Sequence, residues 1–291
     1  MKIKKKMRIL LIAVTSLIAL SLWLIWQNTS LMVTDITVNS ERLPSAFDGF
    51  RIAHISDLHN AEFGNDNCRL IDSLREIQPD MVVITGDLID SRCTDVDVSL
   101  KAVEQMVPIA PTYYINGNHE SRIDEYERLR AGLEEMGVTV LENKRVVLEQ
   151  NDETITLFGV CDPDFDPDMW TKDGYIIMSE QLEALDVANE DGFSILLSHR
   201  PERFSLYVEH GVDLVFSGHA HGGQVRLPWI GGLFAPGQGL FPQYDAGLFR
   251  QENTQMIVSR GLGNSLFPFR IGNRPEIVVA ELHATSFHDT K

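Results

Sequence analysis

Cysteine is scarce in this chain of 291 residues, which has only Cys68, Cys93 and Cys161. None of the three belongs to a C-x-x-C pair, and their odd number argues against a complete disulfide framework. We interpret them as scattered thiols, with a single bridge left open. Internal repeats and low-complexity tracts are also missing. The apolar content of 44% is that of a globular protein, and the length suits one large α/β domain or two small ones.

Basic residues are few outside the N-terminus. The chain has 25 Lys and Arg against 42 Asp and Glu, a net charge of −17. Five of the positive charges and none of the acids lie in the first eight residues, so the remainder has 20 basic and 42 acidic residues, a net charge of −22. Such a surface favours solubility and repels polyanions, which excludes long nucleic acid as a partner.

Charge is absent altogether from residues 9–26, a stretch of 18 residues that follows the basic cluster. A helix rising ~1.5 Å per residue would here nearly span a hydrocarbon core of about 30 Å. Trp23 and Trp26 stand at its far end, where interfacial aromatics are expected. We predict an uncleaved membrane anchor. The alternative is a cleaved secretory signal peptide, but its apolar region would be unusually long, and no A-x-A site follows Trp26.

The basic flank of such an anchor stays in the cytoplasm. A single pass across the cell membrane then places the rest of the chain on the extracytoplasmic face. A monotopic attachment, with the domain on the cytoplasmic face, is the alternative. No Arg-Arg pair precedes the stretch, so a twin-arginine signal is not supported. We divide the chain into a basic flank and anchor (residues 1–27), a connector with a leading strand (28–50) and the main domain (51–291).

After the anchor, short apolar runs alternate with amphipathic stretches, which indicates βαβ units and a partly parallel sheet. The first half has predicted strands at residues 33–38, 51–55, 81–85 and 112–115 and predicted helices at residues 66–77, 96–107 and 120–136. The second half is richer in strands, predicted at residues 154–160, 194–198, 213–217, 256–259 and 276–282. The pattern alone predicts one α/β domain.

Five short patches of metal-binding side chains follow the predicted strands, where open α/β sheets keep their sites. The patches are Asp57-Leu58-His59, Gly86-Asp87, Gly117-Asn118-His119-Glu120, His199 and Gly218-His219-Ala220-His221. Each alone has an ordinary explanation, such as a turn Asp, a core His or a helix N-cap. Together they supply what two adjacent divalent ions of Zn, Mn or Fe need when one carboxylate is shared. Two such ions can clamp the attacking and leaving oxygens at phosphorus.

This succession of patches resembles the calcineurin-like metallophosphoesterase superfamily, whose pattern is D-x-H, G-D, G-N-H-[DE], a lone His and G-H-x-H. The resemblance covers about residues 45–283 and implies a four-layer α/β/β/α sandwich of two mixed sheets. It implies one metal site formed by Asp57, His59, Asp87 and His221, and a second formed by Asp87, Asn118, His199 and His219. A hydroxide bridging the ions would attack phosphorus, and His119 would steady the phosphoryl oxygens or protonate the leaving group.

Residues 43–59, 259–263 and 274–277 are similar to the membrane-anchored bacterial YkuE/YaeI-like phosphodiesterase branch of this superfamily. The resemblance implies a phosphoester hydrolase, either a phosphodiesterase or a pyrophosphatase. Some relatives cut the pyrophosphate of UDP-2,3-diacylglucosamine, so a lipid-linked substrate is one alternative. The other is a membrane-tethered metal-binding protein with a degenerate site. The complete ligand set, with His119 in addition, favours the hydrolase.

Several residues carry weaker signals. We expect His54 to be a core histidine, and Arg200 and Arg260 to be structural or solvated rather than phosphate-binding. Asp162, at the start of an acidic surface loop, is a candidate to support the site. Residues 227–247 are rich in Gly, Pro and aromatics and lack periodicity, so they are either a lid over the site or a packed structural loop.

Overall fold

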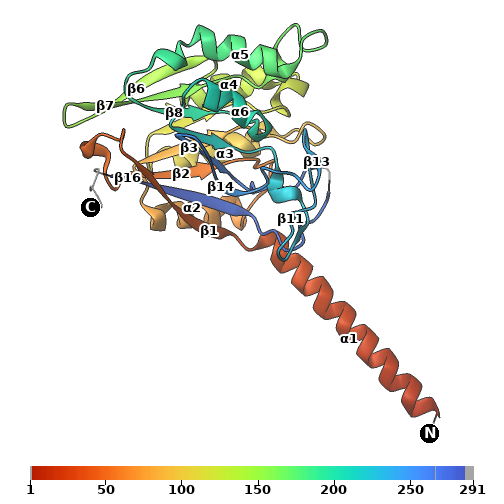
Figure 1. Cartoon of the computed structure of the whole chain (residues 1–291). Coiled ribbons are helices and arrows are strands. Elements are labelled where there is room, and N and C mark those ends of the chain that lie inside the picture. Colours follow the sequence, from red (N-terminus) through yellow and green to blue (C-terminus); the bar gives the residue numbers. More distant parts are fainter. Residues whose placement is uncertain (1, 266, 286–291) are drawn as a thin grey trace.

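Two six-stranded mixed sheets face each other at the centre of the protein, with helices on both outer sides (Figure 1). The computed structural model describes residues 2–265 and 267–285. The strand order is β1-β16-β2-β3-β4-β5 in the first sheet and β14-β15-β9-β8-β7-β6 in the second. This arrangement is the four-layer α/β/β/α sandwich that the resemblance implied.

The first sheet combines parallel strands with one antiparallel neighbour. Its strands are β1 (Met32–Ser40), β2 (Arg51–Ile55), β3 (Met81–Thr85), β4 (Thr112–Ile115), β5 (Thr139–Val140) and β16 (Glu276–Ala284). Strands β2 to β5 are parallel, whereas β16 lies between β1 and β2 and runs antiparallel to β2. The outer face is covered by α2 (Cys68–Ile77), α3 (Val96–Met106) and α4 (Tyr126–Glu135).

The second sheet has a parallel centre and two antiparallel edges. Its strands are β6 (Lys144–Gln150), β7 (Glu153–Gly159), β8 (Phe193–Leu197), β9 (Leu214–Ser217), β14 (Gly247–Gln251) and β15 (Thr254–Val258). Strands β7, β8, β9 and β15 are parallel, and the hairpins β6–β7 and β14–β15 close the two sides. The helices α5 (Gly174–Ala184) and α6 (Phe204–Glu209) cover its outer face.

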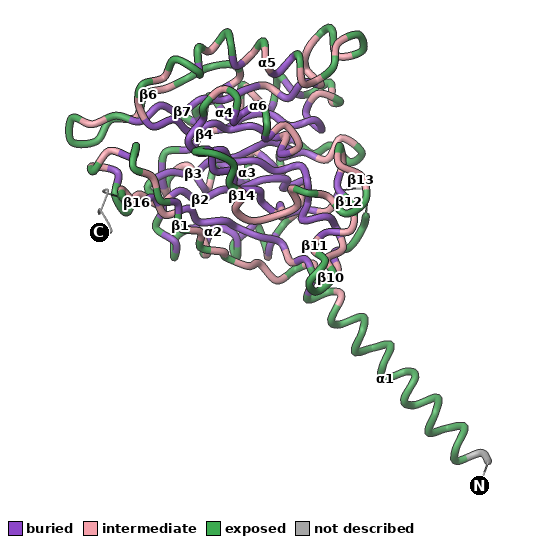
Figure 2. Tube along the Cα trace, viewed as in Figure 1, coloured by how far each residue is buried: buried purple, intermediate pink, exposed green. Residues whose placement is uncertain are grey.

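The central strands are buried on both faces, which explains why they are almost wholly apolar in sequence. In β2, Ile52 belongs to the core between the sheets, whereas its neighbour Ala53 belongs to the core under α2 to α4. Phe193 of β8 and Phe216 of β9 join Ile52 between the sheets. Figure 2 shows this buried interior as a continuous purple region across both sheets. The sheets therefore form a rigid support for the loops at their ends.

Helix α1 (Lys2–Thr29) extends away from the domain and is largely exposed (Figures 1 and 2). Its segment Lys4–Thr29 is long and apolar enough to cross a membrane, judged by length and composition. The last turn is fastened to the domain through Asn28, whose Oδ1 accepts the backbone N–H of Arg270 at 2.7 Å. The Arg274 guanidinium carbon also lies 4.8 Å from the ring centre of Trp26.

Residues 226–240 fold into two short hairpins, of which the first lies at the base of α1 and the second lies farther along the same side of the domain (Figure 2). Strand β10 (Arg226–Leu227) pairs with β11 (Gly231–Gly232), and β12 (Phe234–Ala235) pairs with β13 (Gly239–Leu240). The Arg226 N–H donates to the Ile271 carbonyl at 2.8 Å, which joins the hairpins to the loop before β16. The segment predicted to lack regular structure is therefore partly regular.

Nine strands are predicted from the sequence, and the predicted ends of each lie within two residues of the observed ends. The helices are predicted less accurately. The predicted helix at residues 120–136 is wrong at its start, because Glu120–Arg122 forms a 3-10 turn and α4 begins only at Tyr126. The Glu120 side chain is turned inward to accept backbone N–H groups, so it does not continue into a regular helix. Helices α5 and α6 are not predicted from the sequence at all.

Candidate functional site

The five ligand-bearing patches meet at one edge of the sandwich, although they come from both sheets. The loops after β2, β3 and β4 approach from the first sheet, and those after β8 and β9 approach from the second. Because the strands are parallel within each set, their carboxyl ends lie on the same side. The structure buries all eight predicted site residues there: Asp57, His59, Asp87, Asn118, His119, His199, His219 and His221.

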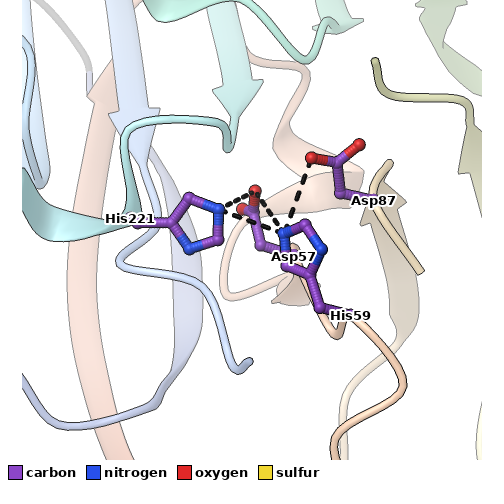
Figure 3. A group of neighbouring side chains, drawn as sticks. All are labelled: Asp57, His59, Asp87 and His221. Carbon is purple, nitrogen blue, oxygen red and sulfur yellow. Dashed lines mark hydrogen bonds and ion pairs between the residues drawn. The ribbon is translucent and has the colours of Figure 1, made fainter. Parts of the chain in front are cut away.

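A first group contains Asp57, His59, Asp87 and His221, whose side chains converge (Figure 3). The Nε2 atoms of His59 and His221 lie 3.1 Å apart, and His221 Nε2 lies 3.2 Å from Asp57 Oδ1. His59 Nε2 lies 3.6 Å from Asp87 Oδ2. One ligand atom from each residue lies within 4.8 Å of the others.

A second group contains Asp87 again, together with His199 and His219. His199 Nε2 lies 3.3 Å from Asp87 Oδ2 and 3.2 Å from His219 Nδ1. The other ring nitrogen of His199 donates to the Thr85 carbonyl at 2.7 Å, which orients Nε2 toward the group. Asp87 therefore stands between two clusters of ligand atoms.

The spacing of these atoms fits divalent metal ions. Ligand atoms around a tetrahedral ion with bonds of 2.0–2.1 Å stand about 3.3–3.4 Å apart, and the separations here run from 3.1 to 4.0 Å, the longest being that from His59 Nε2 to Asp57 Oδ1. Asn118 adds a second observation, because its Oδ1 is buried without a hydrogen-bond partner among the described residues. A buried amide oxygen without a partner is costly unless a cation satisfies it.

The backbone around these ligands is strained. Five of the residues have a positive φ that side chains of L-amino acids rarely adopt: Asp57 (53°), His59 (47°), Asp87 (52°), His219 (65°) and His221 (48°). Gly218 permits the close approach of the two sheets, since a Cβ there would overlap the Ser56 hydroxyl. The surrounding fold stabilises these conformations at a cost, as is typical of functional sites.

Glu120 fastens two ligand loops to each other, a role that the sequence does not reveal beyond its place in the G-N-H-E motif. Its buried carboxylate accepts the backbone N–H groups of Asp87 at 2.9 Å and Gly117 at 2.8 Å through Oε2, and that of Ile89 at 3.3 Å through Oε1. Burial and the nearby charge of Asp87 raise the pKa of Glu120 to about 8, against the effect of these hydrogen bonds. Glu120 thus positions the loops that carry Asp87 and Asn118.

Replacing Glu120 with Ala is expected to lower the free energy of unfolding by about 3 kcal/mol, because three buried N–H groups lose their acceptor. Urea unfolding of the full chain in detergent measures this loss. Glu135→Ala, at an exposed position at the end of α4, is the matched control and is expected to change little. Equal losses in the two variants would contradict the role assigned to Glu120.

Burial controls the protonation of the histidines in these groups. It lowers the pKa of His59 to about 3 and holds the pKa of His219 and of His221 well below the usual range, so these rings are neutral, as metal ligands must be. Burial opposes charge on His199 as well, but the carboxylates of Asp87 and Asp57 outweigh it and raise the pKa of His199 to about 10. A metal ion bound here would replace the charge of that proton.

His119 differs from the other histidines in its contacts. Its Nδ1 accepts the backbone N–H of Ser91 at 3.1 Å, so the hydrogen-bond network assigns the proton of the neutral ring to Nε2. Nδ1 also lies 3.7 Å from Asp90 Oδ1, and His59, Asp90 and His119 form a third cluster of ligand atoms. Burial lowers the pKa of His119, which favours the neutral ring.

A pocket of about 400 Å³ opens over both groups. Its wall includes Asp87, Asn118 and His119 on one side and His219 and His221 on the other. The pocket therefore gives a molecule in solution access to the ligand clusters.

Comparison with known proteins now assigns the chain to a family. The model of the calcineurin-like phosphoesterases matches residues 50–223. The chain belongs to the calcineurin-like phosphoesterase family. It is 30% identical to the uncharacterized metallophosphoesterase YkuE of Bacillus subtilis over 268 residues, 87% of this chain and 86% of YkuE. It is 27% identical to the phosphodiesterase YaeI of Escherichia coli over 242 residues, 80% of this chain and 82% of YaeI.

Two further comparisons extend the likeness. A zebrafish transmembrane protein with a metallophosphoesterase domain is 31% identical over 254 residues, 84% of this chain, but the chain spans only 56% of that protein's length. Among solved structures, TT1561 of Thermus thermophilus matches this phosphoesterase with a TM-score of 0.50 at 14% identity, over 73% of this chain and 90% of that one. The structural match supports the fold alone. Together the comparisons confirm the predicted superfamily and branch, and the enzyme is a hydrolase of the metallophosphoesterase class.

Three arginines line the pocket of the phosphoesterase, and each is paired with an acid. Arg92 Nη2 lies 2.6 Å from Asp90 Oδ2, and Arg122 Nη2 lies 3.0 Å from Asp164 Oδ2. Arg200 makes a bidentate ion pair with Asp162, at 2.6 and 2.7 Å, and its Nη1 lies 3.2 Å from His219 Nε2. The positive charge that the pocket offers a phosphate is thus largely balanced.

The weaker signals have mixed outcomes. His54 is a buried core residue, as predicted, with Nε2 2.8 Å from the Thr85 hydroxyl. Arg200 lines the pocket of the phosphoesterase, but its bidentate ion pair with Asp162 agrees with the structural role predicted for it, and Asp162 holds this arginine at the pocket wall. Arg260 does not line the pocket; its backbone N–H donates to Glu276 at 3.1 Å. From residues 227–247, Pro236 and Gly237 form part of the pocket wall.

Proposed function

We propose that this phosphoesterase hydrolyses phosphodiester or pyrophosphate bonds with two divalent metal ions. The observation that carries the proposal is the position of Asp87, which belongs to both ligand groups at the base of the pocket. One ion would be bound by Asp57, His59, Asp87 and His221, and the other by Asp87, Asn118, His199 and His219. The bound ions would supply electrostatic stabilisation of the phosphoryl group and activation of water.

The protein's own groups orient the reaction. The N–H at Nε2 of His119 is the donor that this side chain offers in the pocket, either to a phosphoryl oxygen or to the leaving oxygen. The backbone N–H of His119 donates to Asp87 Oδ1 at 2.8 Å, so the same segment aligns the shared carboxylate and the donor. Thr85 orients His199 through its carbonyl. Most of the proposed ligands are therefore supported by a hydrogen bond or by the strained loop that carries them.

The charge of the pocket supports a diester rather than a monoester. A phosphodiester carries one negative charge, whereas a monoester carries close to two at neutral pH. Arg92, Arg122 and Arg200 are already paired with carboxylates, and no other Lys or Arg is among the residues that line the pocket. Apart from the two bound ions, the pocket therefore offers little uncompensated side-chain charge for the second charge of a monoester.

The test is hydrolysis of bis-p-nitrophenyl phosphate beside p-nitrophenyl phosphate by the full chain in detergent. The protein is stripped with a chelator and then resupplied with Mn, Zn or Fe. We expect no turnover after chelation, recovery with metal, a higher rate on the diester, and a lower melting temperature of the stripped protein, because metal binds the folded state. Turnover that survives complete metal removal would refute the proposal, and absent turnover with two ions bound would favour a metal-binding role.

We further propose that residues 1–27 anchor the enzyme in the cell membrane, with the connector at residues 28–50 leading into the catalytic domain at residues 51–291 on the extracytoplasmic face. The exposed, apolar helix α1 and its basic N-terminal flank support this topology. Cys93, which is exposed in the folded domain, offers a test of the face. We expect a membrane-impermeant thiol reagent to label Cys93 in intact cells. If Cys93 is labelled only after the cells are lysed, the catalytic domain lies on the cytoplasmic face.

A further inference from the structure

Exposed apolar side chains gather at one end of the domain, beside the pocket and the base of α1. Outside α1, most of the large apolar side chains that are exposed among the described residues lie in two segments, residues 227–241 and 267–269. We name six of them the apolar rim: Trp229, Ile230, Leu240, Phe241, Phe267 and Phe269. A patch of this kind on an otherwise charged protein marks an interaction site.

The segments that carry the apolar rim have no charged residues. Residues 227–241 and 261–269 contain no Asp, Glu, Lys or Arg, although the chain beyond its first eight residues has a net charge of −22. Acidic side chains would be repelled by anionic lipid headgroups, and unpaired charges of either sign would resist transfer out of water. This surface is therefore suited to a lipid bilayer.

Two residues of the apolar rim are exposed to solvent although their backbone conformation is strained. Trp229 has a φ of 65° and is 103% exposed, and Phe241 has a φ of 55° and is 62% exposed. Bulky side chains rarely adopt this backbone conformation, and neither ring gains burial in return. The packing of the domain does not explain these two positions, whereas a partner that buries the rings outside the protein would.

The apolar rim is continuous with the anchor. Phe267 and Phe269 stack edge to face, with ring centres 6.0 Å apart, immediately before Arg270, whose backbone is bonded to Asn28 in the last turn of α1. Hairpin β10–β11 is fastened to the same region through the bond from Arg226 to Ile271. Figure 2 shows β10 and β11 at the point where α1 leaves the domain.

Residues 227–241 and 261–269 also reach the pocket. Pro236 and Gly237 belong to residues 227–241, Ser265 belongs to residues 261–269, and all three line the pocket wall. The apolar rim thus borders the mouth of the site on one side and the base of α1 on the other.

We propose that the apolar rim inserts into the interfacial layer of the bilayer that α1 enters, so that the pocket opens at the level of the lipid headgroups. Trp and Phe side chains suit this layer, and α1 confines the domain to its surface. The consequence for the substrate rests on the proposed function: the enzyme takes a phosphodiester or pyrophosphate whose apolar part stays in the bilayer.

Insertion is tested by tryptophan fluorescence of the full chain in vesicles of phosphatidylcholine with or without bromine on the acyl chains. Bromine quenches only rings that contact lipid. Trp229→Phe is expected to lower the bromine-quenched emission by roughly one third, since Trp23, Trp26 and Trp229 would contact lipid. Trp170→Phe is the matched control: Trp170 is 87% exposed but precedes α5, and its loss should remove only unquenched emission. Unchanged quenching in Trp229→Phe overturns the proposal.

The substrate consequence is tested in the same vesicles with a nitrophenyl phosphodiester of diacylglycerol, beside dissolved bis-p-nitrophenyl phosphate. The double variant Trp229→Ser/Phe241→Ser should cleave the lipid diester about tenfold more slowly and the dissolved diester at an unchanged rate, whereas Trp170→Ser should change neither. If the unaltered enzyme and the double variant cleave the lipid diester at equal rates, the proposal that the substrate stays in the bilayer is refuted. If the unaltered enzyme cleaves neither diester, the proposed function fails, while the quenching result still decides the membrane contact.

Discussion

Replacing Asp87 with Ala is expected to abolish hydrolysis, with kcat lower by more than about 10³-fold, and to remove bound metal at the same time. Asp87 Oδ2 lies 3.6 Å from His59 Nε2 and 3.3 Å from His199 Nε2, so the two ligand groups share this carboxylate. Its loss also leaves the proton on His199 without its main partner. Steady-state kinetics with the diester and metal analysis of the purified protein measure both effects.

The matched control for this variant is Asp72→Ala, which removes a carboxylate from the exposed face of α2. Among the residues that the structure describes, Asp72 pairs only with Arg75, one turn along the helix, and such exposed pairs contribute little to stability. Metal content and kcat should therefore stay at their original values. An Asp87→Ala enzyme that retains both ions would remove the shared carboxylate from the mechanism.

Replacing His119 with Ala is expected to lower kcat by about 10²–10⁴-fold while both ions stay bound, because His119 acts as a donor rather than a ligand. The size of this loss in kcat should depend on whether the leaving group needs a proton. Nitrophenolate leaves without help, whereas an alkoxide needs a proton, so the effect should be larger for an alkyl diester than for a nitrophenyl diester. Rates on the two substrates and metal analysis separate these contributions.

The third ligand cluster makes this experiment decisive, since His119 also lies near His59 and Asp90. Loss of one ion from His119→Ala would assign His119 to a metal site and contradict the donor role. His283→Ala, at the edge of β16 and far along the chain from any ligand, is the matched control and should change neither kcat nor metal content.

The sequence predicts which side chains meet at the site because each of them follows a short apolar strand. Asp57, Asp87 and His199 come within two residues of the ends of β2, β3 and β8, and parallel strands carry such loops to one edge. The contacts that support the ligands are harder to predict. Arg200 and Asp162 are 38 residues apart, and their ion pair depends on the packing of two loops that no local pattern specifies.

The helices show the same limit. The residues from Glu120 onward have the composition of a helix, but the Glu120 carboxylate is directed to N–H groups on the neighbouring loop after β3, and α4 starts later. Residues 227–247 have no periodicity, yet their hairpins form because backbone bonds tie them to the strand-like segment around Ile271. In both places a tertiary contact, absent from the local sequence, decides the structure.

The position of β16 determines when, during synthesis of the chain, the site can form. Strand β2, which leads to Asp57 and His59, has β16 as one of its two neighbours, and within the described part of the chain β1 pairs with β16 alone. Until residues 276–284 leave the ribosome, both strands present unpaired edges. At 5–20 residues per second, roughly 10–50 s separate the synthesis of β2 from that of β16. The first sheet is therefore completed only after β16 has been synthesised, and chains truncated before residue 276 should fail to bind metal.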